Sequence, residues 1–321
     1  MKSLASILAL ALLTAIGLGS ATAQTYPSKP IRIVVPFPAG GPADVQVRII
    51  GQKLTESWRQ PVLVDNRPGA NTIIGAEAVA KAAPDGYTLL MAIDSTLVMN
   101  QSLYSKLPYD PIKDFAPVTL TAWSPLIIAV DAATGPKSVK DLVQDAKANP
   151  GKVNFGAGTI TTQLGGEMLK RAAGINMVYV PYKGSAGTVQ GLLSGDVKFI
   201  IDGVTSSVPH IKSGKFRVIA TMGTRPIAAL PGLPTLAAEG VPGVDVAVWI
   251  GIVAPAGTPA DIIDKLQHEI ARILILPDVK EKLLSVGLDP ATSTPAEFAA
   301  FIRSESERWG KAIKEAGIRL D

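Results

Sequence analysis

The stretch of sequence that decides the fold is residues 31–44, IRIVVPFPAGGPAD. Its first residues are mostly branched and apolar, which predicts a buried strand. A loop with Gly40 and Gly41 follows, and Pro42 opens a segment whose apolar residues recur at helical spacing, Val47, Ile50 and Leu54. The stretch therefore predicts a strand, a glycine loop and a helix, which is the repeating unit of an open α/β sheet.

The same alternation of strand and helix continues along the chain. We expect further strands at residues 62–64, 88–93, 126–130, 153–156, 177–180, 197–202, 217–221 and 246–253. We expect helices at residues 42–57, 71–82 and 161–173, and after the helix-start residues Ser138, Thr258 and Thr294. Because strands that alternate with helices form parallel sheets, the first three strands predict a parallel sheet covered by helices on both faces.

Two such α/β units followed by a helical end predict two lobes. Proline-rich stretches at residues 108–117 and 230–242 are candidates for the crossovers between them. We place one hinge near Ala122 and the return near Val246. Residues 24–122 and 246–321 then form the first lobe, residues 123–245 form the second, and a ligand cleft lies between them.

The composition excludes several classes of function. The chain of 321 residues is 47% hydrophobic and 18% charged, which predicts a packed core rather than disorder. Its net charge of +4 is scattered, so we expect no nucleic-acid partner. The chain has no cysteine and only two histidines, His210 and His268, so we expect no disulfide, no metal site and no cofactor.

The N-terminus has the pattern of a secretory signal peptide, which we place at residues 1–23. Lys2 precedes an apolar run at residues 4–18, and Ala21-Thr22-Ala23 has the small residues that signal peptidase cleaves after. A membrane anchor is the alternative, but the run is shorter than the roughly 20 residues that span a bilayer. We therefore expect export of a soluble protein to a bacterial periplasm.

The loop between the first strand and its helix is a candidate ligand site. In open α/β sheets, ligands bind beyond the carboxyl ends of the strands. The first turn of a helix offers unpaired N–H groups and a partial positive charge, which suit a carboxylate. An ordinary tight turn, with Pro42 as the first helical residue, is the alternative. Asp44 would repel an anion unless it accepts hydrogen bonds from nearby amides, orders water, or pairs with an amine on the ligand.

A second loop, residues 155–162, has the same arrangement of strand, glycine and helix start. It offers backbone amides and the hydroxyls of Thr159, Thr161 and Thr162, and it could hold a ligand from the opposite side of a cleft. An ordinary loop with a threonine cap is the alternative. Neither loop has the spacing of a nucleotide-binding motif.

Catalytic motifs are missing from the sequence. Neither G-x-S-x-G nor S-x-x-K occurs, so no serine nucleophile is indicated. Asp94 and Asp202 follow predicted strands and could be acid–base groups, but a cap or a polar contact to a ligand is the simpler interpretation. We therefore expect a binding protein rather than an enzyme.

Eight segments in order along the chain share one family pattern, namely residues 26–37 with Gly40, Gly41 and Asp44, then 66–70, 84–89, 107–110, 180–184, 233–235, 249–251 and 254–259. Together they resemble the Bug-type receptors of tripartite tricarboxylate transporters. The second loop differs, because it is shorter than in many members and has Gln163-Leu164 in place of a His-Leu pair. The resemblance covers essentially the whole chain after the predicted signal peptide.

The resemblance implies a two-lobed periplasmic-binding-protein fold (a type II Venus flytrap), each lobe a mixed sheet flanked by helices. It also implies a small carboxylate ligand (a di- or tricarboxylate, an aromatic carboxylate or an acidic amino acid), membrane transporter subunits as partners, and a monomer. The ligand contacts that it implies are at Phe37, Ala39, Gly40, Gly41 and Asp44, and at Gly158, Thr159, Thr161 and Thr162. Ser95, Tyr182 and Asp202 are further polar candidates from the sequence itself.

Two other functions stay open from the sequence. A ligand-loaded protein could be presented to a sensor kinase instead of a transporter, or the chain could be an exported hydrolase or isomerase.

Overall fold

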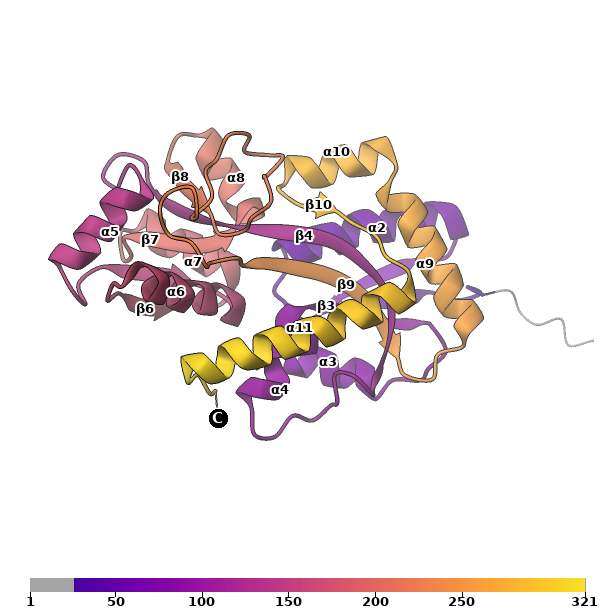
Figure 1. The fold of residues 1–321 in the computed structure, drawn as a ribbon. Helices are drawn as coiled ribbons and strands as arrows, with labels where there is room; N and C mark the ends of the chain where they lie inside the picture. Colours follow the sequence, from indigo (N-terminus) through magenta and orange to yellow (C-terminus); the bar gives the residue numbers. More distant parts are fainter. Residues whose placement is uncertain (1–25, 321) are drawn as a thin grey trace, which may run out of the picture.

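The computed structural model describes residues 26–320, so the predicted signal peptide lies outside the described residues. Two lobes are joined by two long strands, β4 (Phe115–Asp131) and β9 (Ala247–Pro255), which run side by side from one lobe toward the other (Figure 1). The sheet order is β2-β1-β3-β9-β4-β7-β5-β6, with β8 and β10 also paired to β4. The two-lobed mixed α/β fold predicted from the sequence is confirmed.

The first lobe is built on residues 31–44, the strand, glycine loop and helix start. Its strands are β1 (Ile31–Val35), β2 (Val62–Asn66), β3 (Thr88–Ile93) and β10 (Asp289–Pro290). Its helices are α2 (Pro42–Trp58), α3 (Ile73–Ala80), η1 (Ser95–Met99), α4 (Asn100–Leu103), α9 (Ala260–Leu274), α10 (Pro277–Ser285) and α11 (Pro295–Ala316). As predicted, β1 pairs in parallel with β2 and β3, whereas β9 is antiparallel to β3 and β4.

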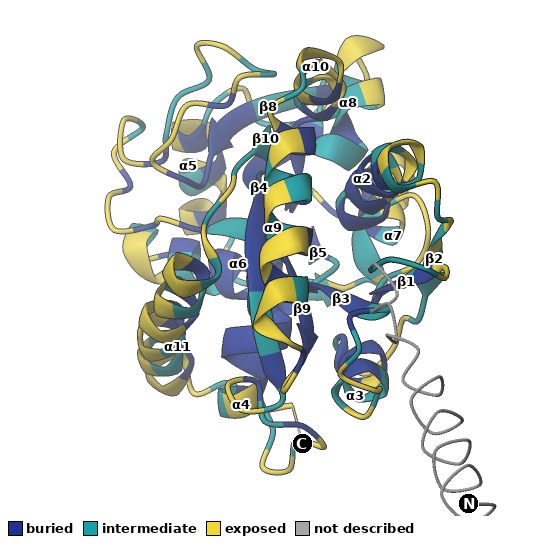
Figure 2. Cartoon of the chain, turned by 90° about the vertical axis from the view of Figure 1, so that its right-hand side faces the viewer, coloured by how far each residue is buried: buried dark blue, intermediate teal, exposed yellow. Residues whose placement is uncertain are grey.

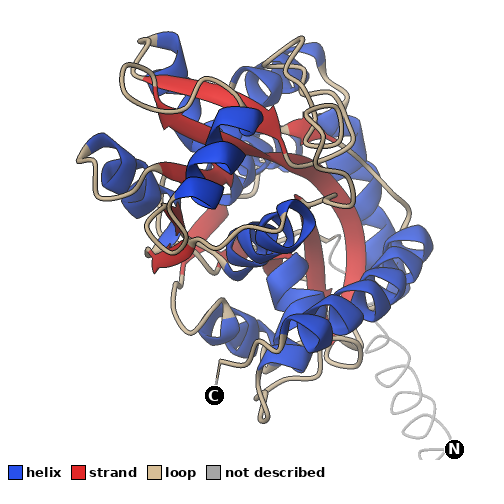
Figure 3. Cartoon of the chain, turned by 60° about the vertical axis from the view of Figure 1, so that its left-hand side comes forward, coloured by secondary structure: helices blue, strands red, loops and turns tan. Residues whose placement is uncertain are grey.

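The second lobe repeats the plan with a different strand order. Its strands are β5 (Asn154–Ala157), β6 (Val178–Pro181), β7 (Phe199–Gly203) and β8 (Phe216–Thr221). Its helices are α5 (Val139–Ala148), α6 (Ile160–Ala173), α7 (Gly184–Leu193) and α8 (Val204–Lys212). β5 is parallel to β6 and β7, and β7 and β8 are antiparallel to β4. Helices cover the strands of both lobes (Figure 3).

The core explains why β1 lacks the polar alternation of a half-exposed strand. Ile31, Ile33 and Val35 pack in one apolar cluster with residues of α2 and α9, whereas Val34 packs in another with residues of α3 and α11. Both faces of the strand are therefore buried, as in parallel sheets generally. Figure 2 shows the same pattern, with buried strands and with helices α9 and α11 exposed on their outer faces.

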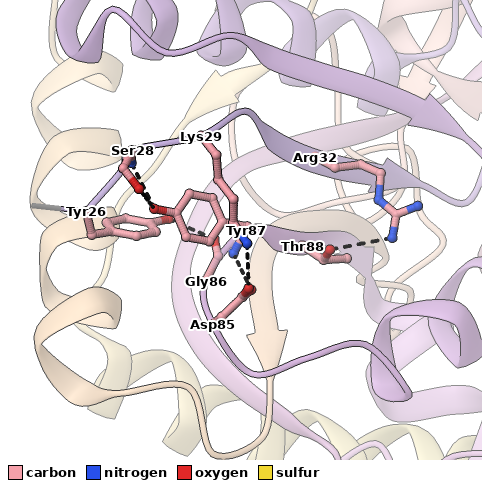
Figure 4. Close-up of polar contacts among 8 residues, drawn as sticks. All are labelled: Tyr26, Ser28, Lys29, Arg32, Asp85, Gly86, Tyr87 and Thr88. Atoms are coloured by element: carbon pink, nitrogen blue, oxygen red, sulfur yellow. Dashed lines mark hydrogen bonds and ion pairs between the residues drawn. The ribbon is translucent and has the colours of Figure 1, made fainter. Parts of the chain in front are cut away.

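The start of the described chain is fixed to the loop before β3 (Figure 4). The hydroxyl of Tyr26 donates to the carbonyl of Gly86 at 2.7 Å, and the amide of Ser28 donates to the hydroxyl of Tyr87 at 2.8 Å. Lys29 forms an ion pair with Asp85 at 3.0 Å. The segment before β1 is thus an integral part of the first lobe.

The strand predicted at residues 126–130 is much longer than expected, which is a correction. Pro117 ends a proline-rich stretch that we expected to be a crossover, yet Pro117 and Pro125 both lie within β4, where the pairing with β9 shifts register twice, after Pro117 and after Leu120. A proline lacks only its own N–H, and bulges let a strand accommodate it. The hinge expected near Ala122 falls inside this strand, and the lobe boundaries at 122/123 and 245/246 stay predictions.

The predicted helix starts are right at two positions and wrong at one. The hydroxyl of Ser138 accepts from the amide of Asp141, and Thr294 forms a capping box with Glu297. Thr258 is not a cap, because its hydroxyl donates to the carbonyl of Pro255 and α9 begins one residue later than expected. Among residues 26–320, no helix combines the length and the apolar character needed to cross a bilayer.

Candidate functional site

A cavity of about 100 Å³ lies between the lobes, beyond the carboxyl ends of β1, β5, β6 and β7. The first lobe and the long strands supply a mostly apolar wall, formed by Phe37, Pro38, Ala39, Gly41, Pro42, Ala43, Ile93, Ser124, Leu126, Val248 and Ile250. The second lobe supplies a mostly polar wall, formed by Thr159, Thr162, Lys183, Gly184, Ser185, Ala186, Asp202 and Gly203. A bound molecule would therefore contact both lobes at once.

Four helices begin at this cavity. The residues that precede the first turns of α2, α6, α7 and α8 all line it, namely Gly41, Thr159, Lys183 and Gly203. The first turn of a helix has N–H groups without intrahelical partners and a partial positive charge of about half an elementary charge. Four such ends around one small space make a site for an anion, and Lys183 adds a positive charge.

The loop before α2 is held in shape by Asp44, which is buried. Its carboxylate accepts hydrogen bonds from the amide of Gly40 at 2.9 Å, from Asn66 Nδ2 at 2.9 Å and from Arg48 Nε and Nη2 at 2.9 Å each. Asn66 Nδ2 also donates to the carbonyl of Phe37 at 3.1 Å. Burial acts to raise the pKa of Asp44, but the hydrogen bonds from Arg48, Gly40 and Asn66 outweigh it and lower that pKa.

These hydrogen bonds bear on how Asp44 can lie beside an anion site. Both carboxylate oxygens are occupied within the first lobe, and Asp44 does not line the cavity. The geometry does not support the interpretation in which Asp44 pairs with an amine on the ligand. It agrees better with the interpretation in which Asp44 accepts a hydrogen bond from a nearby backbone amide, here that of Gly40. Gly40 does not line the cavity either; its φ of +90° makes the turn that brings Gly41 there.

The loop before α6 uses its threonines for structure. Thr159 and Thr162 form a capping box, in which Thr159 Oγ1 accepts from the amide of Thr162 at 3.3 Å and Thr162 Oγ1 accepts from the amide of Thr159 at 3.1 Å. Both residues line the cavity. Thr161 points elsewhere, because its buried hydroxyl donates to Asp94 Oδ1 of the first lobe at 3.0 Å. The hydroxyl that we expected at the ligand instead joins the two lobes.

Asp94 and Ser95 lie in the interior rather than at the cavity wall. Asp94 is fully buried, and its Oδ1 also accepts from the amide of Ser95 at 2.8 Å. Burial raises the pKa of Asp94 to about 7, although the hydrogen bonds from Ser95 and Thr161 oppose the shift. Asp94 Oδ2 and Ser95 Oγ have no hydrogen-bond partner among the described residues.

The loop between β6 and α7 is the part of the site that sequence reasoning missed. Lys183, Gly184, Ser185 and Ala186 line the cavity, whereas the predicted contact Tyr182 does not. The Tyr182 ring instead lies over Gly191 of α7, where an added Cβ would be only 2.1 Å from its hydroxyl. The signal was present, because a strand, a glycine and a helix follow one another here as they do in the other two loops.

Gly158 sits where the α6 and α7 loops touch. Its carbonyl accepts from the amide of Gly184 at 3.1 Å, and it does not line the cavity. A Cβ at Gly158 would lie 2.5 Å from the carbonyl carbon of Gly184 and 2.7 Å from Thr188 Oγ1. Only glycine permits this approach, so the residue sets the distance between two of the four helix starts.

Replacing Gly158 with alanine is expected to destabilise the chain by about 1–3 kcal/mol, because backbone atoms must move to admit the methyl group. Chemical denaturation measures the loss. Gly223→Ala is the matched control, since an added Cβ there has no neighbour closer than 3.8 Å. Equal stability of the two variants would show that the contact between the loops is not tight.

The last predicted contact, Asp202, is the penultimate residue of β7 and lines the cavity. Its Oδ1 accepts from Ser185 Oγ at 2.6 Å and from the amide of Gly203 at 2.7 Å. Burial raises the pKa of Asp202 to about 6, although these two hydrogen bonds oppose the shift. Within residues 26–320, no group of three or more His, Cys, Asp or Glu side chains could hold a metal ion.

The geometry is that of a small anion-binding cleft between two lobes, and comparison with known proteins assigns the family. The model of the tripartite tricarboxylate transporter family receptor (TctC) matches residues 46–318. The chain belongs to this family. The predicted resemblance is thus confirmed, and the chain is a solute-binding receptor rather than an enzyme.

Curated relatives of this TctC receptor extend over nearly the whole chain. A UPF0065 protein from the tcbD-tcbE intergenic region of Pseudomonas sp. (strain P51) is 40% identical over 91% of this chain and 88% of the relative. Protein BugT of Bordetella pertussis is 36% identical over 93% of each chain.

Solved structures of similar proteins have the same fold. An R. palustris protein solved with adipate is 34% identical, with a TM-score of 0.88 over 92% of this chain and 99% of that one. MatC from Rhodopseudomonas palustris, solved with bound malate, is 29% identical, with a TM-score of 0.81 over 90% of this chain and all of that one.

Proposed function

We propose that this TctC receptor captures a small carboxylate in the cavity between its lobes and delivers it to the membrane subunits of a tripartite transporter. The observation that carries the proposal is the convergence of four helix starts on one cavity. A carboxylate there accepts hydrogen bonds from backbone amides and is stabilised by the helix dipoles. The adipate and malate in the two similar structures support a carboxylate over other anions.

The proposal includes capture by closure of the lobes. The direct hydrogen bond from Thr161 to Asp94 joins the second lobe to the first, and Gly203 faces Pro42 so closely that an added Cβ would lie 3.7 Å from its ring. A ligand that contacts both walls would favour this arrangement by its greater affinity for it. Residues 1–23 would direct the chain to the periplasm, where it would act as a monomer.

A panel of carboxylates tests the function directly. At a concentration about 100 times its Kd, a true ligand should stabilise the chain by about 2.7 kcal/mol, which raises Tm by roughly 5 °C in a chain of this size. Differential scanning fluorimetry with mono-, di- and tricarboxylates measures this shift. No stabilisation by any carboxylate, and no heat of binding by calorimetry, would contradict the proposed function.

Filling the cavity provides the site-specific control. Ala186 is an exposed residue that lines the cavity, so Ala186→Phe should abolish the ligand-induced shift with little effect on the Tm of the free protein. Ala148→Phe places the same ring on an exposed position of α5, away from the cavity, and should leave binding unchanged. Binding that survives Ala186→Phe would place the ligand elsewhere.

A further inference from the structure

One acceptor in the cavity wall has no partner. Asp202 is 3% exposed, and its Oδ2 has no hydrogen-bond partner among the described residues, whereas its Oδ1 has two. Buried polar atoms in folded proteins nearly always have a partner, because an unpaired one loses its hydration without replacement. An unpaired carboxylate oxygen in a ligand cavity therefore indicates that the ligand supplies the partner.

The side chains around Asp202 do not supply that partner. Lys183 is the one cationic residue and Asp202 the one acid among the residues that line the cavity, and no ion pair joins them in the described part of the chain. Ser185 already donates to Oδ1. The contrast with Asp44 is direct, because Arg48 and Asn66 there leave neither oxygen free.

The state of Asp202 determines what it can bind. Burial raises its pKa only to about 6, and the amide of Gly203 at the start of α8 stabilises the charged form. Near pH 7.5 the carboxyl is therefore mostly ionised, and an ionised carboxylate only accepts hydrogen bonds. The ligand group opposite Oδ2 must then be a donor, and a second bare carboxylate at that point would be repelled.

We propose that the ligand of this receptor is a carboxylate that also carries an O–H or N–H donor, and that this donor binds Oδ2 of Asp202. The inference rests on the proposed function and narrows it. The carboxylate of the ligand lies among the helix starts of α2, α6 and α7, and its hydroxyl or amino group faces the end of β7. Asp202 is thus the specificity-determining residue that separates hydroxy- and amino-carboxylates from their unsubstituted parents.

Pairs of ligands that differ by one donor test the inference in the unmodified protein. Succinate, malate and aspartate form one set, and benzoate, 3-hydroxybenzoate and 3-aminobenzoate form another. Calorimetry at pH 7.5 should show the donor-bearing member binding roughly 10- to 100-fold more tightly than its parent, the effect of one hydrogen bond to a charged group. Because this comparison needs no variant, it remains decisive even if substitutions at Asp202 fold poorly.

Asp202→Asn then assigns the preference to the residue. The amide keeps one oxygen for Ser185 and Gly203 but presents an N–H₂ donor where Oδ2 was, so the preference for the donor-bearing ligand should fall at least tenfold or reverse. Asp196→Asn is the matched control, because it removes the same charge from an exposed site in the same lobe that does not line the cavity.

The outcomes separate this inference from the proposed function. Equal affinity for parent and substituted ligands, or a preference that survives Asp202→Asn, would overturn the role of Asp202 while carboxylate capture stands. Failure of every carboxylate to bind would overturn both.

Discussion

Replacing Asp44 with alanine is expected to destabilise the chain by about 2–3 kcal/mol and to weaken ligand binding at least tenfold. The change removes a buried carboxylate that accepts four hydrogen bonds. A hydrogen bond to a charged group contributes about 1.5–3 kcal/mol to stability. The total is smaller than their sum because the side chain of Arg48 is half-exposed and regains water. Binding falls because the loop that carries Phe37 and Gly41 to the cavity loses its brace. Denaturation and calorimetry measure the two effects.

Asp141→Ala is a close control for this variant. Asp141 occupies the same position in α5 as Asp44 in α2, the third residue of the first turn, and its Oδ2 accepts from the amide of Lys137 four residues earlier. It is exposed, and neither an arginine nor an asparagine pairs with it in the described chain. We expect Asp141→Ala to cost about 0.5–1 kcal/mol, with unchanged binding. A similar loss for both variants would show that Asp44 acts only as a helix-start acid.

The stability difference between wild type and Asp44→Ala should depend on pH, because the pKa of Asp44 is lowered in the folded chain. A carboxyl whose pKa is lower in the folded than in the unfolded chain contributes stability above its ordinary value of 3.8. That contribution is lost as the pH falls through the folded value. The gap between wild type and Asp44→Ala should therefore be largest at neutral pH and shrink in acid.

The local pattern of the sequence predicted most of the fold. Branched runs such as 31–35 and capped helix starts such as Thr294 are short-range signals, and the elements that they indicate are present. The long strand β4 was underestimated because Pro117 and Pro125 are strand breakers by local rules, and only pairing with β9, more than 100 residues away in sequence, makes them tolerable.

The candidate site was predictable only in part, for a related reason. The loop at residues 36–44 was found because its strand, glycines and helix start are contiguous. Which side chains face the cavity depends on partners distant in sequence: Asn66 holds Asp44, and Asp94 draws the hydroxyl of Thr161 away from the cavity. The free oxygen of Asp202 depends likewise on Ser185 occupying the other one. None of these pairings leaves a local pattern in the sequence.

Replacing Asp94 with asparagine is expected to make the chain more stable relative to wild type at alkaline pH than at acid pH. The pKa of Asp94 is raised from 3.8 to about 7 because the carboxyl is buried, so its neutral form is the one that the fold favours. For an acid with a raised folded pKa, this stability is fully present below about pH 4 and is lost as the pH rises to about 7. A shift of this size corresponds to about 4 kcal/mol between the two limits. Asparagine does not ionise, so the variant keeps its stability over that range.

Denaturation at pH 5 and pH 8.5 gives the free energy of unfolding of the variant minus that of the wild type at each pH. Comparing these two values cancels any loss of packing that is the same at both pH values. The oxygen of the amide can still accept from Ser95 and Thr161, so the contact between the lobes is retained in the variant. Asp131→Asn is the control without pH dependence. The pKa of Asp131 is lowered from 3.8 by hydrogen bonds from Thr134, so its carboxyl is ionised at both pH values, and its replacement should cost the same stability at pH 5 and pH 8.5. If the effect of Asp94→Asn on the free energy of unfolding is the same at pH 5 and pH 8.5, as expected for Asp131→Asn, then folding does not raise the pKa of Asp94 and the prediction is wrong.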